Sequence, residues 1–204
     1  MGLGYRFKYI YNGNRYKIMP KKTDTVVEAG VYKGYDTAIF AKLANRVLGF
    51  EPSPRNFKKA QENLRSFRNV KMINSGLWNS QKEMKICYGE KSEDDGFLEP
   101  DQDSGRTGRK IQVDTLKGHL SSIGVDNVDF LKIEAEGAEV EVIEGLNGLR
   151  PRSIVVNAGE ERGGEPTGKD VVSLLKQMGY SLVGLKMGHV LFFTSKKIDD
   201  CALF

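Results

Sequence analysis

Cysteine and histidine are scarce in this sequence, with two of each among 204 residues. Cys87 and Cys201 are far apart, so they form neither a disulfide framework nor a metal site, and we expect no bound metal. A reducing, cytoplasmic setting is therefore expected. His119 and His189 are isolated from each other, which favours packing or surface roles, although a histidine titrates near neutral pH and could serve as a general base.

Long apolar runs and dense charge are also missing. No apolar stretch approaches the roughly 20 residues of a membrane-spanning helix, and the basic, aromatic N-terminus lacks the apolar core of a signal peptide. The net charge is +4. This mild, dispersed excess favours a solvated surface over a nucleic-acid partner. The last four residues, Cys201 to Phe204, fit a prenylation box, but we interpret them as a short tail.

Apolar and polar residues alternate in a way that predicts strands and helices in turn. Buried strands are expected at 25–30, 46–53, 70–74, 128–134 and 152–158. Helical spacing is found between them, at 35–44, 54–67, 138–146 and 168–179. Two further strands are expected at 82–89 and 109–116, a helix around His119, and a final antiparallel pair at 180–185 and 189–195.

Strands that alternate with helices predict an α/β fold with a doubly wound, mostly parallel, Rossmann-like sheet. The antiparallel last strand and a hairpin around Asn12-Gly13, within residues 1–22, complete this prediction. We expect one domain over residues 1–204. A polar loop at 89–109 has no strand or helix pattern, which indicates a mobile or functional segment.

The stretch "VVEAGVYKGYDT", residues 26–37, is the most informative one. It joins the first strand to the first helix, and ligands of open α/β sheets bind at such strand ends. Gly30 permits a tight turn and a close backbone approach. Glu51 ends the next strand at the distance, roughly 20 residues, at which an acid holds the hydroxyls of a ribose. The alternative is two structural glycines and two surface acids.

The glycine pattern does not favour a dinucleotide. That ligand calls for three glycines in G-x-G-x-x-G, whereas this loop has only Gly30 and Gly34, which are four positions apart. An acid at Glu28 would repel a pyrophosphate and suit a cation. S-adenosylmethionine carries an amino group, a sulfonium and a ribose but no phosphate, so the pattern favours this cofactor over a nicotinamide dinucleotide.

Five segments resemble the FkbM family of methyltransferases and together cover roughly residues 24–149. They are "VVEAGVYKGYDT", "VLGFEPSPRNFKKAQENL", "NVKMINSGLWN", "QVDTL" and "VDFLKIEAEGAEVEVIEGL". The family typically has Lys-Ile-Asp-x-Glu-Gly where this chain has "KIEAEG", residues 132–137. Its first motif usually reads Asp-x-Gly-Ala-Asn-x-Gly, so Glu28, Tyr32 and Glu134 depart from the pattern. The resemblance implies a class I fold that binds S-adenosylmethionine.

The resemblance also implies roles for residues around the cofactor. Gly30 and Gly34, with the backbone of Ala29 and Tyr32, should face the methionine portion, and Glu28 its ammonium. Glu51 should hold the ribose, with Pro52 and Ser53 lining the turn. Four residues that follow the third strand should flank the adenine: Ser75, Gly76, Leu77 and Trp78. Core packing is the alternative for Trp78, because aromatic side chains bury large areas.

Catalysis is expected at the end of the central strand. Methyl transfer is an in-line displacement that depends on positioning, and an oxygen nucleophile must also lose a proton. We interpret Glu134 and Glu136 as the candidate catalytic carboxylates, although Glu136 could instead cap the next helix. Lys132 precedes them in a buried strand, where it requires a carboxylate partner, so a structural ion pair is at least as good an explanation as catalysis.

The sequence therefore predicts an S-adenosylmethionine-dependent methyltransferase that acts on an oxygen of a small-molecule acceptor, such as a sugar, a lipid or a secondary metabolite. Two alternatives stay open. One is an RNA or protein methyltransferase that uses the basic N-terminal hairpin, and the other is a cofactor-binding module without catalysis. Specificity would lie in the hairpin, the 89–109 loop and residues 159–168. Oligomeric state, including a homo-oligomer, is left open.

Overall fold

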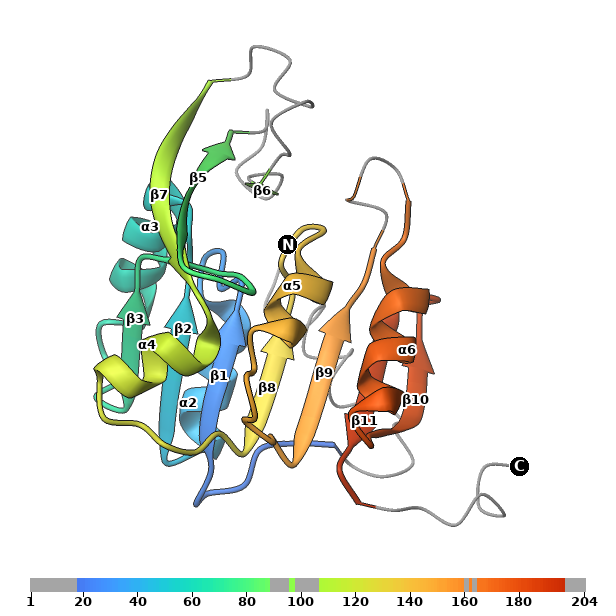
Figure 1. Cartoon of the computed structure of the whole chain (residues 1–204). Helices are drawn as coiled ribbons and strands as arrows, with labels where there is room; N and C mark the ends of the chain where they lie inside the picture. The colour runs from blue at the N-terminus through green and yellow to red at the C-terminus, as the bar shows by residue number, and fades with distance from the viewer. Residues whose placement is uncertain (1–17, 89–95, 98–106, 160–161, 163–164, 197–204) are drawn as a thin grey trace.

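A computed structural model describes residues 18–88, 96–97, 107–159, 162 and 165–196 (Figure 1). The hairpin predicted around Asn12-Gly13 lies outside the described residues. The tail that contains Cys201 and most of the predicted 89–109 loop do so as well.

The central sheet of the described chain has seven strands in the order β10-β11-β9-β8-β1-β2-β3. Neighbouring strands are parallel except where β11 pairs with β9 and β10, and both of those pairings are antiparallel. The predicted α/β architecture and the antiparallel last strand are confirmed. The bounds are β1 Thr25–Ala29, β2 Arg46–Phe50, β3 Val70–Ile73, β8 Phe130–Ile133, β9 Ser153–Asn157, β10 Ser181–Lys186 and β11 Val190–Thr194.

Five helices connect these strands, and local sequence signals account for several of their ends. Ser53 caps the second of them by accepting the backbone N–H of Asn56, and Pro54 follows in the first turn, where no N–H is needed. Each helix ends between one and three residues before the end of its predicted range, and the remaining residues of that range are not helical. Their bounds are α2 Tyr35–Leu43, α3 Pro54–Leu64, α4 Leu116–Ser122, α5 Glu139–Glu144 and α6 Gly168–Gln177.

A second, four-stranded sheet has the order β4-β7-β5-β6. The two strands predicted at 82–89 and 109–116 are present, but they pair with each other here and not with the central sheet. The sequence pattern did not indicate this separate sheet. It extends past the carboxyl ends of the central strands (Figure 1). Its strands are β4 Gly76–Leu77, β5 Lys82–Cys87, β6 Gly96–Phe97 and β7 Gly108–Asp114.

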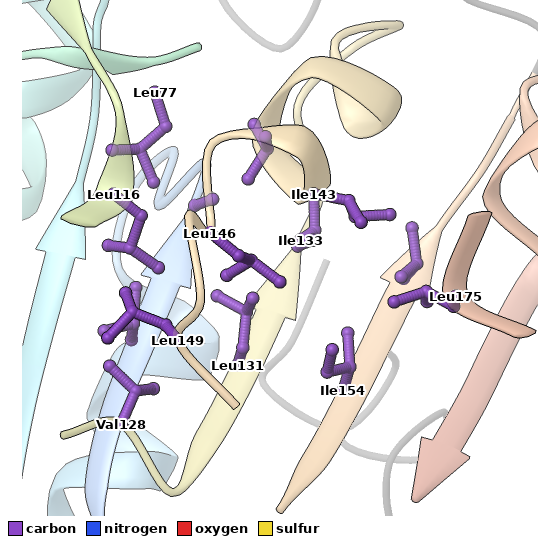
Figure 2. Close-up of a cluster of buried hydrophobic side chains, with 14 of the residues drawn as sticks. Leu77, Leu116, Val128, Leu131, Ile133, Ile143, Leu146, Leu149, Ile154 and Leu175 are labelled. Carbon is purple, nitrogen blue, oxygen red and sulfur yellow. The ribbon is translucent and has the colours of Figure 1, made fainter. Parts of the chain in front are cut away.

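Apolar side chains pack on both faces of the central sheet. On one face, strand residues such as Leu131, Ile133 and Ile154 meet Leu116 of α4, Ile143 of α5 and Leu175 of α6, as Figure 2 shows. The other face packs Val26, Val47 and Phe130 against Phe40 of α2. Successive strand residues point to opposite faces. Glu28 and Lys132, two positions beyond Val26 and Phe130, therefore lie on the α2 face.

The strand order reverses between β1 and β8. The chain runs from β1 outward through β2 to β3, and it later fills the other side with β8 and β9. A crevice outside the carboxyl ends of the strands is expected at such a reversal, and ligands of open α/β sheets bind there. The loop after β1 and the residues after β8 are thus the first place to look for a site. No helix in the described ranges has the length and apolar character needed to cross a membrane.

Candidate functional site

Gly30 brings the loop after β1 into contact with the end of β8. Its φ is 83°, and a Cβ at this position would lie 1.7 Å from the backbone oxygen of Glu134. The Glu134 N–H donates to the Ala29 carbonyl at 2.9 Å, so the two strand ends are joined directly. Glycine is required here for both its left-handed conformation and its lack of a side chain.

The carboxylate of Glu51 joins the end of β2 to the same loop. Its Oε2 accepts the N–H of Tyr32 at 2.7 Å, and its Oε1 accepts the N–H of Ser53 at 2.8 Å. Tyr32 has a φ of 55°, a left-handed conformation that costs a non-glycine residue about 1–2 kcal/mol. A carboxylate has about four acceptor sites. Both oxygens of Glu51 therefore hold the loop after β1 and the turn after β2 in place.

Lys132 sits among three carboxylates on the α2 face. It lies opposite Glu28 in the register of β8 and β1. Its Nζ is 2.8 Å from a carboxylate oxygen of Glu28, of Asp36 and of Glu134. The ion pair expected for Lys132 is therefore present. Thr37 donates its hydroxyl to the other oxygen of Glu28 at 2.5 Å. We call Glu28, Asp36, Lys132 and Glu134 the Lys132 cluster.

The Lys132 cluster carries more negative than positive charge and is almost wholly buried. Glu28 has no exposed surface. Burial raises its pKa to about 7, the Lys132 ammonium opposes this shift, and the neighbouring Asp36 adds to it. Asp36 Oδ1 and Asn157 Oδ1 are also buried, and neither has a hydrogen-bond partner among the described residues. Such surroundings favour a positively charged group.

Glu134 and Glu136 do not share an extended segment. β8 ends at Ile133, and both Glu136 and Gly137 have left-handed conformations, with φ of 49° and 95°. Glu134 accepts a hydrogen bond from the Asn157 amide at 3.0 Å, and its side chain is 15% exposed. Its carboxylate is therefore held between β8 and β9 and still reaches the surface of the site.

Glu139, which the sequence interpretation missed, holds the turn after β8. Its Oε1 accepts the N–H of Ala135 at 3.2 Å and of Gly137 at 3.1 Å, and its Oε2 accepts the Thr167 hydroxyl at 2.8 Å. The carboxylate that supports the loop before α5 is thus that of Glu139, and the capping role that the sequence left open for Glu136 falls to it. Glu139 opens an acidic helical stretch, so its sequence resembles a solvated helix surface.

The four residues predicted to flank an adenine have different surroundings in the structure. Ser75 makes hydrogen bonds to the Gln112 carbonyl at 2.9 Å and to His119 Nε2 at 3.0 Å. Gly76 and Leu77 form β4, and Leu77 belongs to the core. Trp78 is buried against Val113 and Ala138, which matches the packing alternative.

His119 is brought to this region by α4. Its ring lies 5.2 Å from that of Phe50 at the end of β2. The side chain is half-buried, and burial lowers its pKa in spite of the Asp114 charge. The packing role expected for His119 is therefore present, next to Ser75.

The strand order, with its antiparallel last strand, defines the fold as the Rossmann-like fold of the class I methyltransferases. The chain belongs to the FkbM methyltransferase family, because the family model of the methyltransferase FkbM domain matches residues 28–182. This match extends beyond the 24–149 range over which the sequence motifs were recognised, as far as β10.

Individual relatives are distant in sequence. Methyltransferase sdnD of Sordaria araneosa is 23% identical over 213 residues, which cover 86% of this chain and 81% of that protein. The crystal structure of methyltransferase FkbM from Methylobacillus flagellatus KT has a TM-score of 0.56 at 15% identity. That match covers 85% of this chain and 44% of the other, so this chain spans less than half of its length.

A structure that contains the cofactor has the same fold. Aeropyrum pernix fibrillarin, solved with natively bound S-adenosyl-L-methionine, has a TM-score of 0.50 at 15% identity. The match covers 85% of this chain and 67% of fibrillarin.

Proposed function

We propose that this chain transfers the methyl group of S-adenosylmethionine to an oxygen of a small molecule, such as a sugar, a lipid or a secondary metabolite. The observation that carries the proposal is the position of Glu134. Its carboxylate is fixed by Lys132 and Asn157 at the end of β8, directly beside the Gly30 loop. A hydroxyl acceptor must lose a proton, and a carboxylate held at this point can take it.

The cofactor would lie across the ends of β1 and β2. The Gly30–Gly34 loop, with Ala29 and Tyr32, would face the methionine portion, and Glu51, with Pro52 and Ser53, would hold the ribose. The adenine would lie near Ser75, Gly76, Leu77 and Trp78. Glu28 has no exposed surface, so it would act on the cofactor's ammonium through the charge of the Lys132 cluster.

When bound, S-adenosylmethionine supplies the methyl carbon for an in-line displacement by the acceptor oxygen. The chain's own residues orient the two reactants and accept the proton. Glu134 is the proton acceptor in this proposal, because it combines partial exposure with two fixed partners. Glu136 follows in the turn and would contact the acceptor.

The first test is calorimetric titration of the protein with S-adenosylmethionine and with S-adenosylhomocysteine. Glu51→Ala should weaken binding by about 1.5–3 kcal/mol for each charge-assisted hydrogen bond lost to the ribose. Because Glu51 also holds the N–H groups of Tyr32 and Ser53, thermal unfolding must be measured alongside. Glu62→Gln, at an exposed acid of α3, is the matched control and should bind like the wild type.

The second test measures formation of S-adenosylhomocysteine in the presence of hydroxylated acceptors. Glu134→Gln should lower turnover while the affinity for the cofactor stays close to that of the wild type. If the folded protein binds neither cofactor form, the methyltransferase proposal is wrong. Binding without turnover on any acceptor class would instead support a cofactor-binding module.

A further inference from the structure

The Lys132 cluster lies on the α2 side of the strand reversal, and its contacts come from β1, β8, β9 and α2. Charged groups come from β1, from β8 and the residue that follows it, and from the first turn of α2. Two polar side chains, a hydroxyl from α2 and an amide from β9, contact these groups. The groups that face one another are Glu28, Asp36, Thr37, Lys132, Glu134 and Asn157.

Three carboxylates share a single ammonium in this cluster. Each is 2.8 Å from Lys132 Nζ, and the side chains of Glu28, Asp36 and Lys132 are all at least nine-tenths buried. Isolated charge is strongly disfavoured when it is removed from water, and such groups neutralise themselves by binding a proton or a partner. Asp36 contacts Lys132 through Oδ2 only, and its buried Oδ1 has no hydrogen-bond partner among the described residues, so this carboxylate is incompletely satisfied.

The two forms of the cofactor differ in charge where the reaction takes place. S-adenosylmethionine carries a positive sulfonium, and its product, S-adenosylhomocysteine, carries a neutral thioether. The Gly30 loop, to which we assign the methionine portion, contacts the backbone of Glu134, a member of the cluster. A nearby positive charge stabilises ionised carboxylates and expels their proton.

We infer that the Lys132 cluster exchanges a proton for the positive charge of the cofactor. The arrival of S-adenosylmethionine releases a proton from the cluster, and methyl transfer returns one. In the transfer step the acceptor oxygen forms a bond to the methyl carbon, the carbon–sulfur bond breaks, and its electron pair stays on sulfur. The acceptor's proton moves to Glu134 and so enters the cluster. This inference rests on the proposed function.

The direction of the pH dependence follows from Glu28. Burial raises its pKa to about 7, so it is partly protonated at neutral pH in the protein without a ligand. A bound cation favours the ionised form, which requires the proton to leave. The affinity for S-adenosylmethionine should therefore rise with pH through neutrality, and the affinity for S-adenosylhomocysteine should respond less.

The experiment is calorimetric titration with both ligands at about pH 6 and about pH 8, each in two buffers that differ in ionisation enthalpy. A single group with a pKa near 7 that must ionise predicts about tenfold tighter S-adenosylmethionine binding at the higher pH. Near pH 7 it predicts release of about half a proton. The ammonium is common to both ligands and contributes equally to the two releases, so S-adenosylhomocysteine, which lacks the sulfonium charge, should release fewer protons.

Glu28→Gln separates the cluster from the ligand's own amino group, whose titration is the same for the wild type and the variant. It should remove the proton release attributed to Glu28, whereas the control Glu62→Gln should keep it. Asp36→Asn provides a second variant. It removes a neighbour that raises the pKa of Glu28, so the pH dependence should move to lower pH.

Equal proton release with both ligands, or release that Glu28→Gln leaves unchanged, would overturn the inference. Failure of the folded protein to bind either ligand would overturn the proposed function instead, so the two results are distinguishable. The comparison of the two ligands on the wild type decides the matter even if a variant does not fold.

Discussion

The ammonium of Lys132 lies 2.8 Å from the carboxylate of Glu28, directly opposite it on the neighbouring parallel strand. Both side chains are buried, at 7% and 1% exposure. A buried ion pair contributes little net stability compared with apolar residues, but removal of one partner leaves an uncompensated charge. The stability of the folded protein should therefore depend more strongly on Lys132 than on a lysine in a surface ion pair.

Lys132→Met should lower the free energy of unfolding by about 3–5 kcal/mol, because it leaves three carboxylates next to an apolar side chain in place of their ammonium partner. Urea denaturation measures this change. Lys59→Met is the matched control, since Lys59 pairs with Glu62 on the exposed surface of α3, at 54% and 50% exposure. Its midpoint should stay close to that of the wild type. Similar losses in both variants would contradict the role given to Lys132.

The stability of the wild type should decline with pH in a way that depends on Glu28. Its pKa is raised from 4.5 to about 7 in the folded state. The folded protein thus holds this proton more tightly than the unfolded chain, and the resulting stabilisation is complete below the unfolded pKa and lost as pH rises through 7. Glutamine cannot ionise, so Glu28→Gln should lack this contribution.

Urea denaturation of the wild type and Glu28→Gln at about pH 5 and about pH 8 tests this expectation, because shared groups cancel in the difference. The wild type should lose stability relative to the variant as the pH increases. A difference that is constant with pH, or that changes in the opposite direction, would show that Glu28 does not titrate in this range.

Much of the site could be located from the sequence. β-branched runs predicted the central strands, and the alternation with helices predicted a strand reversal at the end of β1. This was enough to place Gly30, Glu51 and Glu134 at one edge of the sheet, since parallel strands have their carboxyl ends together. A carboxylate partner for Lys132 could also be predicted, because an unpaired charge in a buried strand is energetically costly.

The partners themselves could not be predicted. Asp36 and Asn157 reach the cluster from other elements, and hydrophobic periodicity contains no information on which polar residues meet across a fold. From the sequence, Glu139 resembles an exposed acidic residue of a helix, and only the structure shows that its carboxylate holds the turn after β8. The second sheet was missed because β4 has two residues, Gly76–Leu77, and pairs with a strand more than thirty positions away.

Gly30→Ala should disrupt both the fold and cofactor binding. The added Cβ would lie 1.7 Å from the Glu134 backbone oxygen, so the ends of β1 and β8 must separate. Gly148→Ala is a close control. Its φ of 87° matches the 83° of Gly30, but nothing lies within 4 Å of its Cβ position. Gly148→Ala should lower the free energy of unfolding only by the cost of a left-handed backbone in a non-glycine residue, about 1–2 kcal/mol.

The two glycine variants are compared by thermal unfolding and by calorimetric titration with S-adenosylmethionine. Gly148→Ala should keep the wild-type affinity, and Gly30→Ala should lose binding. Equal behaviour of the two variants would mean that the contact between the Gly30 loop and β8 is not important for the site.

Glu139→Ala should destabilise the turn that follows Glu134. The change removes the acceptor for the part-buried N–H of Ala135 and the buried N–H of Gly137, and a buried N–H left without a partner costs about 1–3 kcal/mol. Glu144→Ala, at the other end of α5, removes one exposed hydrogen bond to Asn79 and should have little effect. Because the turn positions Glu134, turnover should fall more in Glu139→Ala than the loss of folded protein explains. Turnover per folded molecule, measured for both variants, checks this, and an unchanged value for Glu139→Ala would restrict Glu139 to a purely structural role.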